Sequence, residues 1–545
     1  MFKNIAILII LIFAVIIRSY NLSTLPPSLY YDELDAGYQA EVFNKNKTDY
    51  YGNKNPVHFQ SFGDYRTSLY VYSVALAQKI IPDKEFSTRL PSVIFGVISI
   101  YLVYLLTNSL IPSLLLTISP WAIHYSRIAF EASGMIMVLL AGIYFWKKFT
   151  QNSRFSHLLL SIFFFALSPY FYSTSKLFLI LLAVLLGIIW FPKLIKLKPK
   201  KIFIALLFGT LILSPLLVDT FKGKSGFRFS YISIFSEPQL ASTVDYLRYA
   251  DIFTTHQNLT GVSPSLSSKL FHNKYVLILD KFLENYFSAF STEFLFIRGD
   301  QNQRHGFGNH GLLYFLDFFL IIFGIINVLK NRHQDKLGNL FLWILILAPI
   351  PFALTRDSTG AHATRLILML PSLIYLSYQG ILYIKYLHKF TLPAIVFLYF
   401  ISFASFWHYY KFDYPQDSAM AWNWGMKEAV LLTHKYPDNP LVFSDSYISF
   451  VSFYLFYKPY QLEKGDSIKS HLISYSDDSF SGQKLDDKYY FGSINWSNIS
   501  KFPQNTIYVL PKSEIYQIPE SLRVLETIEK KYINSEGFAL FTNEQ

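Results

Sequence analysis

Long apolar runs separated by short polar connections dominate the chain as far as residue 408. A helix that crosses a bilayer needs roughly 20 predominantly apolar residues, and most of these runs approach that length. The pattern therefore predicts about 11 transmembrane helices, the first of them flanked by Lys3 and Arg18. The runs cover residues 5–17, 91–107, 110–122, 132–149, 156–170, 174–191, 202–218, 312–329, 338–354, 366–384 and 391–408.

Residues 409–545 follow a different pattern, because none of their apolar segments is long enough to span a membrane. Short apolar segments at 440–443, 506–510 and 537–542 predict buried strands, and residues 418–434 predict a helix. Strands and a helix together favour a small α/β domain.

The expected fold class is thus an all-α multi-pass membrane protein with a C-terminal α/β domain. We expect a transmembrane domain over residues 1–408, interrupted by two long polar segments at 18–90 and 219–311, and a separate domain over 409–545. Within the first polar segment, residues 68–81 are apolar on one side and too short to span, which predicts an interfacial helix.

The basic residues predict the orientation of the chain. Alternation from a cytoplasmic N-terminus puts four connections inside, at residues 147–155, 192–201, 330–337 and 385–390. Each of them carries Lys or Arg, and Asp335 is the single acid among them, as the positive-inside rule requires. The two long polar segments and the C-terminal domain are then extracytoplasmic.

Composition narrows the class of protein. Only 16% of the 545 residues are charged, against about 25% in soluble domains, which disfavours a soluble multidomain enzyme. The chain has no Cys, which excludes disulfides, thiolate zinc sites and a Cys nucleophile. The net charge of +11 is accounted for by the inside connections, so we expect a lipid bilayer and no nucleic acid among the partners.

Paired acids open the first polar segment, in Tyr30-Tyr31-Asp32-Glu33-Leu34-Asp35. Acids just outside a first span can supply a general base. The alternative is a helix start, with Asp32 as the N-cap and Asp35 at the third helical position. Capping does not exclude catalysis, so the residues leave both interpretations open.

Cations accumulate on the predicted outer face. Arg127, Lys176, Arg298 and Arg365 all fall on that side, where together they can bind a phosphate group. The alternatives are an ion pair between Arg127 and Glu131, and a Lys176 side chain that reaches the headgroups. Further polar residues accompany these cations in the same outer segments: Arg89, His124, Glu131, Asp300, His305 and His362.

A metal site is not defined by the sequence, which contains no HExxH motif and no calcium-binding loop. A divalent metal ion is left open as a cofactor, since nothing fixes the spacing of the candidate ligands. These are Asp32, Glu33, Glu41, His58 and His272.

Several short motifs occur in a characteristic order along residues 1–408. They are Tyr-Asp-Glu at 31–33, Phe62-Gly63-Asp64-Tyr65, Phe86-Ser87-Thr88-Arg89-Leu90-Pro91-Ser92, Ser119-Pro120-Trp121 through Ser126-Arg127 to Phe130-Glu131, Gly299-Asp300, Arg304-His305, and His362 followed by Arg365. In this order the chain resembles the polytopic glycosyltransferases of the GT-C fold. It is most similar to their bacterial branch, which is related to protein O-mannosyltransferases and lipid A aminoarabinose transferases.

The resemblance implies an activity and a location. Such enzymes sit in the bacterial plasma membrane and transfer a sugar from a polyprenyl-phosphate carrier to an acceptor hydroxyl on the outer face. It places the catalytic base on Asp32, with Glu33 orienting substrate. The acceptor would be a glycan, a lipid or a protein. That Arg127, Lys176, Arg298 and Arg365 bind the donor phosphate is our inference from their shared side of the membrane, and the motifs of the family do not carry it.

Other functions compete with this interpretation. A transporter or flippase of lipid-linked glycans usually shows internal repeats, and none is evident in this sequence. A membrane scaffold would leave the outer cluster of charges unexplained. A polymerase or ligase of lipid-linked glycans is poorly separated by sequence, and the sugar and the oligomeric state stay open.

Overall fold

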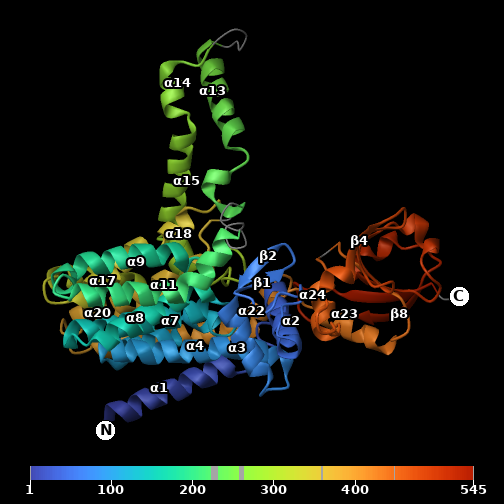
Figure 1. Ribbon diagram of the computed structural model, residues 1–545. Coiled ribbons are helices and arrows are strands. Elements are labelled where there is room, and N and C mark those ends of the chain that lie inside the picture. Colours follow the sequence, from blue (N-terminus) through green and yellow to red (C-terminus); the bar gives the residue numbers. More distant parts are fainter. Residues whose placement is uncertain (1, 223–230, 257–262, 357–359, 447, 544–545) are drawn as a thin grey trace. The chain divides into compact units, whose positions relative to one another are not determined.

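The structure is a computed structural model that describes residues 2–222, 231–256, 263–356, 360–446 and 448–543 (Figure 1). The chain forms two compact units. Unit 1 combines residues 1–104, 122–137 and 400–545, and unit 2 combines residues 105–121 and 138–399.

Apolar helices make up most of unit 2 and also contribute to unit 1. Six helical segments of the described residues are long and apolar enough to cross a membrane, and the chain is a multi-pass membrane protein. The predicted count of about 11 stays a prediction, because the run at 110–122 is broken at Ser119 and Pro120 into two short helices, α5 (Leu110–Ile118) and α6 (Pro120–Tyr125). The six segments are α4 (Lys84–Thr107), α7 (Ala132–Asn152), α11 (Pro199–Phe221), α17 with α18 (Lys336–Ala353), α19 through α20 (Ala363–Ile384) and α21 (Thr391–Phe412).

Two glycines bring α16 (Phe315–Lys330) and α20 (Leu370–Ile384) into backbone contact. A Cβ atom at Gly324 would lie 1.9 Å from the carbonyl oxygen of Leu376, and one at Gly380 would lie 2.0 Å from that of Leu320. Small residues at such a crossing let membrane helices approach closely. The remaining helices of this unit include α8 (Phe155–Phe171), α9 (Ser175–Ile189) and α10 (Phe191–Leu194).

The long polar segment predicted at 219–311 is largely helical. It contains α13 (Leu240–His256), α14 (Leu266–Phe271) and α15 (Lys274–Ser288), which Figure 1 shows as two helical columns, one of α13 and one of α14 and α15. Residues 223–230 and 257–262 of this segment lie outside the described residues.

The first polar segment folds in unit 1 as α2 (Tyr31–Asn46), a hairpin of β1 (His58–Ser61) and β2 (Asp64–Thr67), and α3 (Ser68–Gln78). The predicted helix over 68–81 is thus α3. The helix α3 directly follows the hairpin, and α1 (Phe2–Ser19) precedes the whole segment. The two strands of the hairpin pair antiparallel around Gly63. Gly63 has φ +78°, a conformation that favours glycine.

A seven-stranded sheet forms the C-terminal part of unit 1, in the order β4-β5-β6-β3-β7-β9-β8. The three predicted strands are confirmed as β3 (Leu441–Ser444), β7 (Ile507–Pro511) and β9 (Phe538–Thr542), neighbours at the centre of the sheet. β3 runs parallel to β6 and β7, and the other pairs are antiparallel. The sequence pattern does not predict the other four strands, in which polar residues interrupt the apolar ones: β4 (Leu472–Ser476), β5 (Phe480–Leu485), β6 (Tyr489–Ile494) and β8 (Arg523–Ile528).

The helix predicted over 418–434 is wrong in part. The chain forms α22 (Tyr414–Ser418) and α23 (Met426–Leu432), separated by a turn that ends at Gly425 with φ +98°. That left-handed conformation interrupts a continuous helix.

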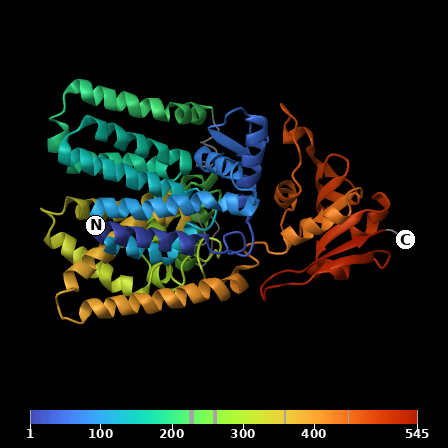
Figure 2. The ribbon, with the colours of Figure 1, turned by 90° about the horizontal axis from the view of Figure 1, so that it is seen from below.

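One hydrophobic core joins the first polar segment to the C-terminal residues. Leu34 and Tyr38 of α2 are buried together with Phe453 and Phe456 of α24 (Val451–Tyr457) and Phe443 of β3. Figures 1 and 2 show α23 and α24 beside the strands of the sheet. Residues 409–545 therefore share a core with the first segment, which differs from the division at residue 408 that the sequence predicts.

Candidate functional site

The start of α2 positions the three acids of the motif. Tyr30 is the N-cap, with extended backbone, and its N–H donates to Oε2 of Glu33 at 3.0 Å. The interpretation of Asp32 as the N-cap is therefore wrong, because the helix begins two residues earlier than that interpretation requires. Asp32 lies in the first turn, where its side chain is released from a capping role.

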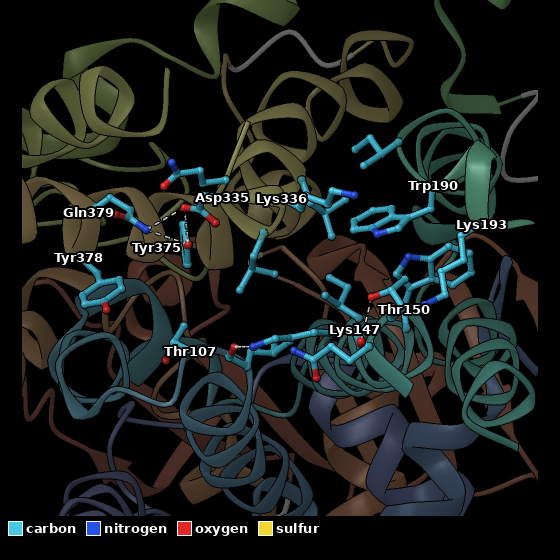
Figure 3. A pocket seen from close by; sticks show the side chains of 18 of the residues that line it. Thr107, Lys147, Thr150, Trp190, Lys193, Asp335, Lys336, Tyr375, Tyr378 and Gln379 are labelled. Carbon is cyan, nitrogen blue, oxygen red and sulfur yellow. Dashed lines mark hydrogen bonds between the residues drawn. The ribbon is translucent and has the colours of Figure 1, made fainter. Parts of the chain in front are cut away.

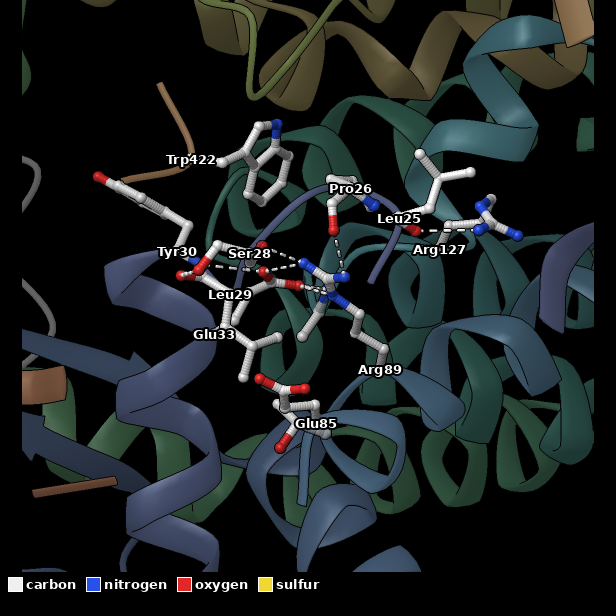
Figure 4. Close-up of polar contacts among 12 residues, drawn as sticks. Leu25, Pro26, Ser28, Leu29, Tyr30, Glu33, Glu85, Arg89, Arg127 and Trp422 are labelled. Carbon is white, nitrogen blue, oxygen red and sulfur yellow. Dashed lines mark hydrogen bonds and ion pairs between the residues drawn. The ribbon is translucent and has the colours of Figure 1, made fainter. Parts of the chain in front are cut away.

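Glu33 is completely buried in an ion pair with Arg89 of α4 (Figure 4). Arg89 donates from Nε to Oε1 at 2.9 Å and from Nη2 to Oε2 at 2.8 Å. Oε1 also accepts the N–H of Ala129 at 2.7 Å. Arg89 further donates to the carbonyl oxygens of Leu22 and Ser28, at 3.0 and 2.6 Å. Such a saturated pair fixes the loop before α2 and leaves Glu33 no access to substrate.

Asp32 is the accessible acid of the group. Its side chain is 41% exposed, whereas that of Asp35 is 1% exposed. Arg66 on β2 contacts Asp32 through Nη2 and Asp35 through Nε, and its Nη1 lies 3.5 Å from Oε1 of Glu131. One guanidinium thus lies among three carboxylates and offsets their mutual repulsion.

Asp35 is the buried anchor of this cluster. Its Oδ1 accepts the hydroxyl of Tyr50 at 2.6 Å. Burial raises the pKa of Asp35, while the charge of Arg66 and the hydrogen bond from Tyr50 act in the opposite direction. Arg66 and Tyr50 were missed by the sequence analysis because they lie 34 and 15 residues from their acid partners, beyond any local pattern.

Arg127 occupies a structural position. It is fully buried and donates to the carbonyl oxygens of Ile17, Arg18, Tyr20 and Leu25, at 2.6 to 3.0 Å. These carbonyls include the last ones of α1, which have no partner within the helix. The arrangement favours a role in fixing the end of α1 over the predicted contact with a donor phosphate.

His124 is also buried, in an aromatic cage of unit 1. Its Nδ1 lies 3.3 Å from the hydroxyl of Tyr410, and its ring meets those of Tyr414 and Trp422 edge to face. Trp422 also stacks against the guanidinium of Arg89, whose Cζ is 5.6 Å from its ring (Figure 4). The predicted supporting residues Arg89, His124 and Glu131 therefore lie around the base of α2.

The predicted residues of unit 2 form a second group. Asp300 is buried, and its Oδ2 accepts the N–H of Ala363 at 2.7 Å. The rings of His305 and His362 lie 4.5 Å apart, and Nδ1 of His305 lies 3.0 Å from Oγ1 of Thr364. The structure thus brings together two motifs that lie about 60 residues apart, with separations of 59 and 63 residues across these two bonds.

The cations of unit 2 differ in their exposure. Arg298 is 70% exposed and pairs with Oε1 of Glu293 at 3.0 Å. Arg365 is half-buried and donates to Oγ1 of Thr355 at 2.9 Å. Lys176 is half-buried in the first turn of α9. A cavity of about 390 Å³ is lined by Arg298 and Asp300 together with Ser288, Ser291, Gln301 and Ala361.

The candidate metal ligands are not gathered. Within the described part of the chain, no group of three or more His, Asp or Glu side chains is placed to hold a metal ion. At the acid cluster the positive charge is that of Arg66. The described residues therefore define no metal site, and a divalent ion stays open as a cofactor.

One protein family matches a part of the chain that includes several of these site residues. Residues 66–218 match the family described as dolichyl-phosphate-mannose-protein mannosyltransferase. The predicted resemblance is confirmed over that stretch. It begins at Arg66 of the acid cluster and includes Arg89, His124, Glu131 and Lys176. No curated protein matches the chain.

Solved structures give more distant similarities. The archaeal oligosaccharyltransferase AglB from Archaeoglobus fulgidus, in complex with an inhibitory peptide and a dolichol-phosphate, is 12% identical over 88% of this chain, with a TM-score of 0.46. This chain spans 62% of the length of that protein. ArnT from Cupriavidus metallidurans, in the apo state, is 8% identical over 99% of this chain and 97% of its own, with a TM-score of 0.41.

Proposed function

We propose that the protein is a membrane glycosyltransferase of the GT-C type, which moves a sugar from a polyprenyl-phosphate carrier to an acceptor hydroxyl. The observation that carries the proposal is the exposed carboxylate of Asp32, held by Arg66 at the start of α2. A lipid-phosphate donor is supported by the family matched at residues 66–218, whose description names a dolichyl-phosphate sugar.

In the proposed reaction the acceptor oxygen bonds to the anomeric carbon of the sugar. The bond from that carbon to the phosphate oxygen breaks, and polyprenyl phosphate leaves with the bonding electrons. The acceptor proton passes to Asp32. A positioned base contributes roughly 10²–10⁴-fold to such a step, and nearby carboxylates stabilise a transition state with oxocarbenium character.

Arg66 is the positioning residue of this scheme. It contacts Asp32 and the buried Asp35 at the same time, so it fixes the orientation of the Asp32 carboxylate. Glu33 supports the site differently from the sequence-based prediction. It is buried against Arg89 and holds the backbone on which Asp32 stands.

Lys176, Arg298 and Arg365 are proposed as ligands of the departing phosphate. Their support is their charge and, for Arg298, its exposure beside a cavity that also contains Asp300. A guanidinium binds phosphate oxygens in a bidentate manner. Arg127 is removed from this set because its donors are directed at backbone carbonyls.

We place the reaction on the outer face of a bacterial plasma membrane, with the N-terminus cytoplasmic and residues 409–545 outside. The support for this orientation is the basic character of the predicted inside connections. The acceptor class is a glycan, a lipid or a protein.

The test is a transfer assay with full-length protein in proteoliposomes. A panel of radiolabelled polyprenyl-phosphate sugars serves as donor, with envelope lipid, glycan and protein fractions as acceptors. We expect label to move to an acceptor fraction with wild-type protein and not with Asp32→Asn. Asp438→Asn is the matched control, because it makes the same change at an exposed loop carboxylate, and it should behave like the wild type. Failure of the wild-type protein to release polyprenyl phosphate from every donor would contradict the proposal.

A further inference from the structure

A second cavity in unit 2 is unrelated to the acid cluster. It has a volume of about 700 Å³ and lies where α7, α9 and α17 end or begin. Figure 3 shows its polar side chains converging from several helices. A cavity of this size is in the range that holds a small molecule.

The walls of the cavity carry an excess of positive charge. Three lysines line it, Lys147, Lys193 and Lys336, against the single carboxylate of Asp335. A neighbouring cavity of about 410 Å³ shares Lys193 and adds Lys196. The lysines therefore define one basic region, which we call the lysine cavity and take as the residues that line these two spaces.

The carboxylate of Asp335 is occupied by neighbouring groups. Its Oδ1 accepts the N–H of Gly338 at 2.7 Å, at the start of α17. Its Oδ2 accepts the hydroxyl of Tyr375 and the amide of Gln379, each at 3.0 Å. Asp335 thus caps a helix and orders one wall through Tyr375 and Gln379, as Figure 3 shows, so both of its oxygens already accept hydrogen bonds.

The lysines keep donors for a ligand. Lys147 donates to the carbonyl oxygen of Leu106 at 2.5 Å, and Lys193 donates to that of Thr150. An ammonium group has three N–H donors, so each of these contacts fixes the direction of the lysine and leaves two donors. The carbonyl groups that hold the lysines carry no formal charge. The positive charges of the lysines are therefore not neutralised by these contacts and can attract an anion.

Apolar and aromatic residues complete the cavity. Trp146 and Trp190 line it with their ring centroids 5.9 Å apart, edge to face. Ile143, Ile189 and Leu340 add aliphatic surface. In membrane proteins, tryptophan side chains are enriched at the depth of the lipid headgroups. Cations beside aliphatic side chains suit a ligand that has a phosphate at one end and an acyl chain at the other.

The cavity lies at the end of the unit that the charge pattern assigns to the cytoplasm. Three of the four predicted inside connections contribute to it, those at 147–155, 192–201 and 330–337. The loop with Asp300 precedes α16, and the cavity is reached after α16 ends at Lys330. A helix of 16 residues is about 24 Å long, so the two places are far apart within the unit.

We propose that the lysine cavity binds the phosphate group of an anionic lipid from the cytoplasmic leaflet. Basic pockets between membrane helices on this side bind such headgroups. Free inorganic phosphate has the same recognition chemistry, and the experiment distinguishes the two sources. The proposal is independent of the glycosyltransferase function.

The test measures lipid binding by full-length protein in nanodiscs of phosphatidylcholine. Fluorescent phosphatidylglycerol is titrated in, and energy transfer from protein tryptophans reports binding. The variants are Lys147→Ala, Lys193→Ala and Lys336→Ala. The matched control is Lys148→Ala, which removes the same charge from the next residue of α7 and lies outside the cavity. Lys336 is exposed, so its removal tests charge without disturbing packing.

We expect each cavity lysine to contribute about fivefold in affinity, with Lys148→Ala near wild type. Competition by millimolar inorganic phosphate, with the same dependence on the cavity lysines, would identify free phosphate as the ligand and overturn the lipid assignment. Equal affinities for all four variants, or equal binding of fluorescent phosphatidylcholine, would overturn the anion site itself. Thermal unfolding of each variant is measured in parallel, and Lys336→Ala decides the outcome if the half-buried variants Lys147→Ala and Lys193→Ala do not fold.

Discussion

Glu33 and Arg89 form a two-point ion pair in which both side chains have no exposed surface. The pair joins the first turn of α2 to α4, and it lies one residue from the exposed carboxylate of Asp32. Two adjacent acids therefore have opposite environments, because successive residues of a helix diverge by about 100°. Substitutions at Glu33 should therefore change mainly stability, and substitutions at Asp32 mainly turnover.

Loss of one partner of this pair is expected to destabilise the protein strongly. Glu33→Gln or Arg89→Met leaves a buried charge without its partner, which costs about 3–5 kcal/mol. The double variant Glu33→Leu with Arg89→Met removes both charges and should recover part of that loss. Thermal unfolding in detergent measures the effect. Normal stability of Glu33→Gln would contradict the structural role.

Asp32→Asn is expected to give a folded protein whose turnover falls by about a hundredfold or more. The substitution keeps the size of the side chain and removes its basicity. Binding of the donor should be nearly unchanged, since Asp32 pairs with Arg66, which is not among the proposed ligands of the donor phosphate. Transfer kinetics at saturating donor measure kcat. Activity within a few-fold of wild type would eliminate Asp32 as the base.

Ala substitutions of the arginines are expected to separate donor binding from folding. Arg298→Ala should raise KM for the lipid-phosphate donor without loss of folded protein, because its side chain is 70% exposed. Arg365→Ala should act in the same direction. Arg298→Lys should restore binding poorly if the contact is bidentate. Arg127→Ala, by contrast, should reduce the yield of folded protein, since four backbone carbonyls lose their donor.

The carboxyl group of Asp445 predicts a dependence of stability on pH. Burial raises its pKa from 3.8 to about 6 in the folded state. A raised pKa means that the folded state binds the proton more tightly than the unfolded state, so this group favours folding as the pH falls from 7 to 4. Asp445→Asn should therefore raise the melting temperature at pH 8 and lose this advantage by pH 4. A difference that is constant with pH would exclude Asp445 as its source.

Cysteine labelling is expected to give the orientation directly, because the chain has no native Cys. A single Cys at an exposed position of the C-terminal segment, such as Ser497, should react with a membrane-impermeant maleimide in intact spheroplasts. A Cys in place of Lys200, in the connection 192–201, should react only after permeabilisation. The reverse pattern would invert the orientation, and with it the side assigned to both proposed sites.

The sequence by itself determined the elements whose signal is local. Runs of apolar residues set most of the helices of unit 2, and the most apolar segments of the C-terminal part are the central strands β3, β7 and β9. These predictions succeed because burial on all sides demands continuous apolar sequence, which a window of the chain reveals. The motif of acids at 32–35 was likewise visible.

Only the tertiary structure decided what each charged residue does. Asp32, Glu33 and Asp35 look alike in sequence, yet one is exposed, one pairs with Arg89 and one is held by Tyr50. Their partners come from distant segments, and a side chain's solvation depends on everything packed around it. Arg127 and the lysine cavity follow the same principle, since pairing, burial and convergence are properties of three-dimensional neighbours that a linear pattern does not contain.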